Sequence, residues 1–266
     1  MKLSSPIFVL KSHAKKLKKN QGITMSEALD LVARAEGFSS WSLLKSKSQE
    51  VLPQEYSDIL GYLNDGDLVL IGSRPGMGKT SFALGLFVQA INANHAKSFC
   101  FTLAHTHKEY AARIGTYDQT IGHNNERFEL NYSDDISADY IIKATKNEVA
   151  PGSLIIVDYL QLLDEKRINP PLQTQVEKLK TFAKESGCII IFISQIVRDV
   201  EDRIDKHPTV DDIRLPNPLD LNLMNKIILL YREKRDSKIV DVTFAGKTDH
   251  RFQVGWDGSE VRFFDL

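Results

Sequence analysis

The sequence predicts an α/β protein in which a mostly parallel sheet is flanked by helices, with antiparallel strands at the C-terminal end and a small helical module at the N-terminus. Short apolar runs of strand length, at 68–71, 154–157 and 188–194, alternate with segments of helical length. Towards the C-terminus the apolar segments follow one another closely, and Asp257-Gly258 is typical of a hairpin turn. Residues 1–48 show helical patterns instead.

The length and the charge pattern suggest one large domain with a small appendage. Of 266 residues, 42% are hydrophobic and 26% are charged, which is ordinary for a globular protein with a sizeable core. Residues 1–48 carry nine Lys or Arg against three Asp or Glu, whereas the remainder carries 25 against 32. The basic module therefore suggests an anionic partner, although a solubilising basic face explains the same charges equally well.

Three helices account for the basic module at 1–48. Either Thr24 or Ser26 fits the N-cap of the second helix, which ends at Gly37. The pattern resembles a small N-terminal module of several bacterial and mobile-element proteins, and such a module could bind nucleic acid or a partner protein. Residues 49–65 are interpreted as a linker and lead-in to the next domain.

The main domain, residues 66–266, begins with a phosphate-binding motif. The apolar strand at 68–71 enters a glycine-rich turn, and Gly78-Lys79-Thr80 stands at the start of an apolar helical segment, as in a P-loop or Walker A motif. Glycines let backbone amides approach phosphates, and the helix N-terminus adds positive charge. Lys79 is expected to reach the β- and γ-phosphates, and Thr80 to ligate Mg²⁺. The predicted nucleotide-binding residues are Ser73, Arg74, Pro75, Gly76, Met77, Gly78, Lys79, Thr80 and Ser81.

Asp158 ends the apolar run 154–157, as expected of a Walker B strand whose carboxylate orders Mg²⁺ and its water. Strands that end in aspartate are common, so the prediction depends on the P-loop earlier in the chain. Ser73 departs from the glycine that is usual at the first P-loop position. A glycine-rich turn with a chance Lys-Thr pair is the alternative interpretation.

Several other site classes are disfavoured. His95, His105 and His107 have no companion cysteine or carboxylate at zinc-ligand spacing. Cys100 and Cys188 each lie in an apolar run, which predicts buried, reduced thiols. No apolar run approaches the roughly 18 residues of a membrane span, and the N-terminus lacks the order of a secretory signal, which favours a cytoplasmic protein.

Taken jointly, the motifs over about 58–266 resemble the RecA-like ATPase domain of DnaB-type replicative helicases. The matching segments are Ser73-Arg74-Pro75-Gly76-Met77-Gly78-Lys79-Thr80, Ile156-Val157-Asp158-Tyr159-Leu160-Gln161-Leu162, Phe192-Ile193-Ser194-Gln195-Ile196, and Asp212-Ile213-Arg214 with Tyr231-Arg232. The resemblance implies ATP and Mg²⁺ as cofactors and a γ-phosphate-sensing role for Gln195. It also implies single-stranded DNA as a partner, a role in DNA replication, and a homo-oligomeric ring or filament.

Two departures from the family pattern concern catalysis. The family has a water-polarising glutamate where this chain has Ala104, which cannot accept a proton, and Glu109 lies about one helical turn further on. The family also carries a Lys-x-Arg pair that reaches a neighbouring subunit's nucleotide. Here Lys247 is followed by Asp249 in place of the arginine, and Arg251 is the replacement candidate.

The function expected from these features is an ATP-binding, helicase-type ATPase with hydrolysis slowed by roughly 10²–10⁴. A non-hydrolysing or slow ATP-dependent switch that controls an assembly or a partner complex is the alternative, favoured by Ala104. A P-loop kinase would need an acceptor site and lid arginines, which the sequence does not indicate. The candidates for DNA contact are Lys166, Arg167, Arg214 and Asn217, for which a solvated charged face is an equally good explanation.

Overall fold

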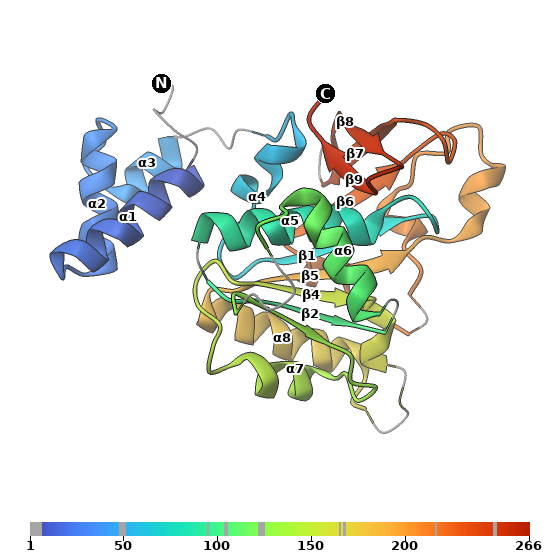
Figure 1. Ribbon diagram of the computed structural model, residues 1–266, viewed down its shortest axis with the longest axis horizontal. Coiled ribbons are helices and arrows are strands. Elements are labelled where there is room, and N and C mark those ends of the chain that lie inside the picture. The colour runs from blue at the N-terminus through green and yellow to red at the C-terminus, as the bar shows by residue number, and fades with distance from the viewer. Residues whose placement is uncertain are drawn as a thin grey trace. The chain divides into compact units, whose positions relative to one another are not determined.

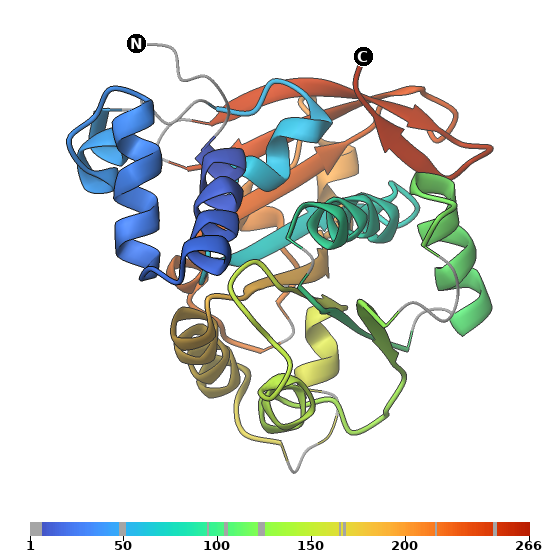
Figure 2. The same cartoon turned by 60° about the vertical axis from the view of Figure 1, so that its left-hand side comes forward.

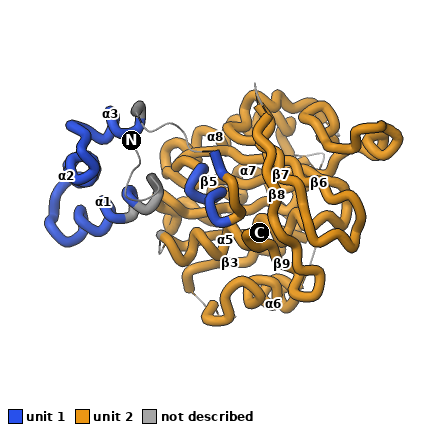
Figure 3. Tube along the Cα trace, turned by 90° about the horizontal axis from the view of Figure 1, so that it is seen from above, with its two compact units in different colours: residues 1–53, 57–62 blue, residues 54–56, 63–266 orange. Residues whose placement is uncertain are grey.

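The computed structural model describes residues 7–47, 52–94, 96–103, 106–121, 126–164, 166, 169–215, 217–246 and 249–266. The chain divides into two compact units (Figure 3). One contains Met1–Pro53 and Ser57–Tyr62, and the other contains Gln54–Tyr56 and Leu63–Leu266. The segment expected as a linker therefore contributes residues to both units, and it contains two short helical elements, η1 (Tyr56–Asp58) and α4 (Ile59–Tyr62).

The first unit is built from α1 (Ile7–Gln21), α2 (Met25–Ala35), α3 (Trp41–Lys47) and α4. Its buried core consists of Leu10, Ala14, Ala28, Val32, Ala33 and Leu44. Of the two predicted caps, Thr24 caps α2. The Glu27 amide donates to Thr24 Oγ1, and the Thr24 amide donates to Glu27 Oε2 at 2.8 Å, which completes a capping box.

The second unit contains a nine-stranded sheet in the order β3-β2-β4-β5-β1-β6-β7-β8-β9 (Figure 1). Its strands are β1 (Leu68–Ser73), β2 (Ser98–Thr102), β3 (Phe128–Asn131), β4 (Leu154–Asp158), β5 (Ile189–Gln195), β6 (Lys226–Tyr231), β7 (Ile239–Ala245), β8 (His250–Asp257) and β9 (Arg262–Phe264). Strands β1 to β6 pair in parallel, and β6 to β9 pair antiparallel. This confirms the predicted parallel sheet with antiparallel C-terminal strands.

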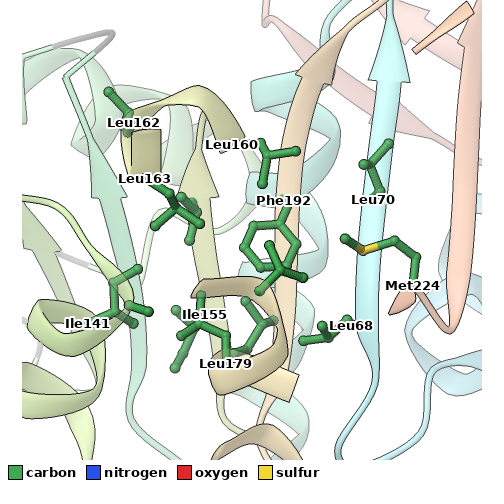
Figure 4. Close-up of a cluster of buried hydrophobic side chains, with 14 of the residues drawn as sticks. Leu68, Leu70, Ile141, Ile155, Leu160, Leu162, Leu163, Leu179, Phe192 and Met224 are labelled. Carbon is green, nitrogen blue, oxygen red and sulfur yellow. The ribbon is translucent and has the colours of Figure 1, made fainter. Parts of the chain in front are cut away.

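Helices cover both faces of the sheet (Figures 1 and 2). The elements are α5 (Lys79–Asn94), α6 (His107–Tyr117), α7 (Ala138–Thr145) and α8 (Leu172–Ser186), with the 3₁₀ turns η2 (Leu160–Asp164), η3 (Arg198–Asp202), η4 (Val210–Asp212) and η5 (Leu221–Leu223). The face with α7 and α8 holds a large apolar core, in which Leu68 and Leu70 of β1 and Phe192 of β5 meet Leu179 of α8 (Figure 4). Helix α5 packs on the other face. Alternate residues of each strand point to opposite faces of the sheet, so the same strands supply apolar side chains to both layers of helices.

Cys100 and Cys188 are buried free thiols, as the apolar runs predict. Helix α6 begins after Thr106, because Thr106 caps it and Glu109 completes the capping box. In the described part of the chain, every helix is too short or too polar to cross a lipid bilayer.

Gly85 in α5 makes room for a buried tyrosine, Tyr56, and a partly buried one, Tyr117. Tyr56 Oη donates to the Phe82 carbonyl at 2.6 Å, and Tyr117 Oη donates to the Ser81 carbonyl at 2.8 Å. A Cβ at residue 85 would lie 2.0 Å from Tyr56 Oη and 2.6 Å from Tyr117 Cε1. We expect Gly85→Ala to lower the free energy of unfolding by about 1–3 kcal/mol, because overpacking outweighs the gain of about 1 kcal/mol in helix propensity. Urea denaturation measures this loss.

Gly115→Ala is the matched control for this substitution. Gly115 also lies inside a helix, α6, but among the described residues no atom beyond its chain neighbours and the backbone of α6 lies within 4 Å of a Cβ placed there. The control is expected to raise stability by up to about 1 kcal/mol, since only the helix propensity changes. If both variants shifted the urea midpoint in the same direction, the packing argument for Gly85 would be wrong.

Candidate nucleotide-binding site

The predicted site lies where the carboxyl ends of four adjacent parallel strands meet. The order β2-β4-β5-β1 is continuous in the sheet, and Thr102 is in register with Asp158 while Ser73 is in register with Gln195. Open α/β sheets bind ligands at this edge, because loops and helix N-termini converge there. The fold therefore places predicted site residues next to each other although they are far apart in the sequence; Ser73 and Gln195, for example, are separated by 122 positions.

The glycine-rich turn between β1 and α5 depends on two left-handed glycines. Gly76 has a φ of +77° and Gly78 a φ of +95°, values that side chains other than glycine rarely adopt. A Cβ on Gly78 would also lie 2.9 Å from the ring of Phe263 in β9. The turn thus combines backbone conformation and close packing that exclude a side chain at this position, and it ends directly at the N-terminus of α5.

Lys79 folds back over the turn. Its Nζ donates to the carbonyls of Ser73 and Arg74, each at 3.0 Å, and lies 3.3 Å from Ser73 Oγ. Burial lowers the pKa of Lys79 to about 8, although the nearby carboxylate of Asp158 acts in the opposite direction. An ammonium group held by neutral acceptors in a partly desolvated pocket favours the arrival of an anion.

Thr80 and Asp158 form the pair expected for a magnesium site. Thr80 Oγ1 donates to Asp158 Oδ2 at 2.9 Å, and Asp158 is only 3% exposed. Hydroxyl and carboxylate oxygens are the ligands that Mg²⁺ takes together with phosphate oxygens and water. In the described portion of the chain, no three His, Cys, Asp or Glu side chains are grouped as metal ligands would be.

The remaining P-loop residues differ in exposure. Ser73 and Ser81 are buried, Met77 is 5% exposed, and Pro75 is exposed. Ser81 Oγ has no hydrogen-bond partner among the described residues, although it lies in the first turn of α5. Its backbone carbonyl accepts the hydrogen bond from Tyr117.

Two arginines flank the phosphate loop. Arg74 pairs with Glu201 and donates to the Arg232 carbonyl at 2.6 Å, which ties the loop to β6 and η3. Arg232 is 3% exposed, donates through Nη2 to the Gly76 carbonyl at 2.9 Å, and lies 5.1 Å from the ring centroid of Trp256. Burial lowers the pKa of Arg232, and its Nε and Nη1 have no partner among the described residues. An anionic ligand at the loop would satisfy such donors.

Gln195 and Gln161 connect the site to a neighbouring loop. The Gln195 carbonyl accepts a hydrogen bond from the Arg214 amide at 2.8 Å. Gln161 Nε2 donates to the Arg214 carbonyl at 3.0 Å and lies 3.4 Å from Ser194 Oγ. The end of β5, which carries the predicted phosphate sensor, is therefore held to the loop that contains Arg214.

The predicted DNA contacts lie in two loops that the structure brings side by side. Asn217 Nδ2 donates to Asp164 Oδ2, which joins the segment after η4 to the end of η2. Arg214 is exposed. Lys166 forms ion pairs with Asp135 and Asp134, so part of its charge is already matched within the chain. Arg167 lies outside the described residues.

Two further predicted positions fall where the structure is not described. Ala104, the position of the expected catalytic base, and Lys247 both lie outside the described residues. Glu109 caps α6: its carboxylate accepts from the Thr106 amide at 2.7 Å and from Thr106 Oγ1 at 2.8 Å. Arg251 lies on β8, where its Nε donates to Thr243 Oγ1 at 3.2 Å.

Two residues near the site were not among the predicted nucleotide-binding residues, although Arg232 stands in one of the segments that match the family. Tyr110 is fully buried and donates to Asp158 Oδ2 at 2.5 Å, and Arg232 reaches Gly76 as described above. The position of Arg232 directly after an apolar strand was an available signal. An arginine next to a buried strand is expected to be at least partly buried, and a buried arginine requires hydrogen-bonding or charged partners. Tyr110 had no such signal, since a tyrosine among the apolar positions of a helix is ordinary core.

The comparison with protein families matches residues 54–147 and 134–247 to the family described as the DnaB-like helicase C-terminal domain. A probable replicative DNA helicase of Trieres chinensis is 24% identical over 242 residues, which are 75% of this chain and 53% of that protein. The replicative DNA helicase DnaB of Haemophilus influenzae is 28% identical over 245 residues, which are 77% of this chain and 52% of that protein. The chain thus spans about half the length of these two relatives.

Solved structures share the fold. A DnaB-like replicative helicase aligns with 96% of this chain and 75% of its own, with a TM-score of 0.69 and 21% identity. An ATPase domain aligns with 91% of this chain and 99% of its own, with a TM-score of 0.66 and 23% identity. A KaiC-like protein from Pyrococcus horikoshii aligns with 79% of this chain and 94% of its own, with a TM-score of 0.57 and 15% identity. The predicted RecA-like fold is confirmed.

Proposed function

The chain belongs to the DnaB-like helicase C-terminal domain family, and we propose that it binds ATP with Mg²⁺ and acts on single-stranded DNA as a helicase-type ATPase with slow hydrolysis. The observation that carries the proposal is the convergence of three side chains. Lys79 is folded over the phosphate loop, and Thr80 from the next position donates to Asp158 from a strand 78 residues away in sequence. Chance glycine-rich turns do not place a Walker B carboxylate beside the helix N-terminus.

Each residue has a distinct part in the proposed site. The amides of the turn and Lys79 bind the β- and γ-phosphates, and Arg232 supplies additional donors beside Gly76. Thr80 and Asp158 hold Mg²⁺, which when bound neutralises phosphate charge during phosphoryl transfer. Gln195, at the end of β5, faces the same edge of the sheet and senses the γ-phosphate. Ala104 itself supplies no carboxylate to activate the water, which is why hydrolysis is proposed to be slow.

DNA binding is proposed for the loops that contain Lys166, Arg167, Arg214 and Asn217. Two hydrogen bonds support it, because they join this loop to the nucleotide site: Gln161 Nε2 donates to the Arg214 carbonyl, and the Arg214 amide donates to the Gln195 carbonyl. The contact must be local, since the main domain is acidic overall. We further propose that subunits assemble into a ring or filament through Lys247 and Arg251, which would reach a neighbour's nucleotide.

A DNA-stimulated ATPase assay combined with strand displacement tests the proposal. The full chain is incubated with ATP, Mg²⁺ and a forked duplex, and Lys79→Ala is the blank for contaminating activity. We expect slow hydrolysis that single-stranded DNA accelerates, together with ATP-dependent displacement, and neither in the blank. ATP binding without any DNA effect would refute the helicase proposal while retaining the nucleotide site.

A slow nucleotide switch is the second candidate function, and Ala104 favours it. In this case ATP occupancy, not turnover, stabilises an assembly or a partner complex. Light scattering with ATP and with ADP separates the two proposals. A switch changes its assembly state with the bound nucleotide and displaces no strand, whereas a motor displaces strands at a rate set by hydrolysis.

A further inference from the structure

A buried tyrosine, Tyr110, donates a hydrogen bond to Asp158, the proposed magnesium ligand. Tyr110 lies in the first half of α6, has no exposed surface, and places its Oη 2.5 Å from Asp158 Oδ2 and 3.1 Å from Thr102 Oγ1. Thr102 ends β2 and is in register with Asp158 on β4. The side chains of Tyr110, Thr102, Asp158 and Thr80 thus form one hydrogen-bonded cluster.

The hydrogen-bonding capacity of this cluster determines the direction of the short contact. A phenol has a single proton, and a carboxylate only accepts. The proton of Tyr110 therefore points to Asp158, at a distance typical of a charge-assisted O–H···O⁻ bond, and the Thr102 hydroxyl is left to donate to Tyr110 Oη. Burial raises the pKa of the Tyr110 phenol, so the group remains a donor.

Two donors from different helices hold the same carboxylate oxygen. Thr80 approaches Asp158 Oδ2 from α5 at 2.9 Å, and Tyr110 approaches it from α6 at 2.5 Å. A carboxylate can rotate about its Cβ–Cγ bond, and two donors in fixed positions select one rotation. Packing alone would not need this arrangement, because an apolar side chain of the same shape could fill the space without a polar partner.

We propose that Tyr110 is a positioning residue that orients Asp158 for Mg²⁺, and that it belongs to the second layer of contacts around the metal. The inference rests on the proposed function, because it assumes that Thr80 and Asp158 hold Mg²⁺ beside a nucleotide. Hydrogen-bonded partners of metal ligands typically change metal affinity by about 10- to 100-fold when they are removed. Helix α6 would thereby couple its own position to metal binding.

Calorimetry with the non-hydrolysable analogue AMP-PNP tests this role without relying on turnover. The full chain is titrated with the analogue in EDTA and in Mg²⁺, and the ratio of the two dissociation constants measures the metal contribution. For Tyr110→Phe we expect this ratio to fall by about tenfold or more, with unchanged binding in EDTA. Electron paramagnetic resonance of Mn²⁺ in the same complex should report a matching loss of metal affinity.

Two control variants separate positioning from a general loss of structure. Tyr140→Phe removes a hydroxyl that contacts the Asn131 side chain instead of Asp158, and it should leave the ratio unchanged. Thr102→Val removes the second contact of Tyr110 while keeping the bond to Asp158, and it should also retain most of the Mg²⁺ effect.

The outcomes distinguish this inference from the function on which it rests. If the unaltered chain binds AMP-PNP with no Mg²⁺ effect, or does not bind it, the proposed function is wrong. If the unaltered chain shows the effect and Tyr110→Phe retains it in full, only the positioning role is wrong. An equal reduction in Tyr110→Phe and Tyr140→Phe would likewise overturn it, because that result indicates nonspecific loosening.

Discussion

Lys79→Ala is expected to weaken ATP binding by about 100-fold or more. The Lys79 ammonium already lies over the phosphate loop, where it donates to the carbonyls of Ser73 and Arg74 at 3.0 Å. The side chain therefore needs little conformational change to contact a bound phosphate. Truncating one partner of a desolvated charge pair weakens the binding free energy by about 2–5 kcal/mol. Each 1.4 kcal/mol corresponds to about a tenfold change in the dissociation constant. Isothermal titration calorimetry with ATP and Mg²⁺ measures the change.

Lys97→Ala is the matched control, because Lys97 directly precedes β2 and so lies at the end of that strand opposite the proposed site. Lys97 forms ion pairs with Glu129 at 3.0 Å and Glu148 at 2.7 Å, and exposed pairs of this kind contribute about 1 kcal/mol or less to stability. ATP affinity should stay within about twofold of the unaltered chain. Comparable losses in the two variants would show that binding responds to overall charge and not to a P-loop lysine.

Ala104→Glu is expected to raise ATP hydrolysis by roughly 10²-fold or more. General-base catalysis contributes about 10²–10⁴ to rates, and the resemblance to DnaB-type helicases indicates that this position carries the base in the family. Single-turnover hydrolysis of radiolabelled ATP measures the change, since it separates the chemical step from product release. ATP affinity should remain nearly unchanged, because the new carboxylate acts on water.

Ala104→Gln controls for the size of the new side chain, because glutamine has the shape of glutamate but cannot act as a base. It should hydrolyse ATP no faster than the unaltered chain. Glu109→Gln should also have little effect, since the Glu109 carboxylate caps α6 through Thr106. Rapid hydrolysis by the unaltered chain that disappears in Glu109→Gln would contradict this assignment of the base.

The sequence predicted the elements well where the signal is local. The run from 68 to 80 reads as strand, glycine turn and helix start because strand apolarity, turn chemistry and helix capping act within a few residues of one another. Helix ends were less certain. Thr24 and Ser26 both satisfy the local pattern, and the hydrogen bonds of the folded backbone select Thr24.

The sequence by itself determined the family, the parallel α/β fold, and the pairing of a phosphate loop with an aspartate at a strand end. Tertiary structure alone decided that Tyr110 reaches Asp158, that Arg232 reaches Gly76, and that Lys166 is paired with Asp134 and Asp135. Motifs are encoded by neighbouring residues, whereas a contact between Tyr110 and a residue 48 positions later depends on how α6 packs against α5. Hydrogen bonds and ion pairs form over about 3–4 Å, so only the packed helices and strands determine which distant side chains meet.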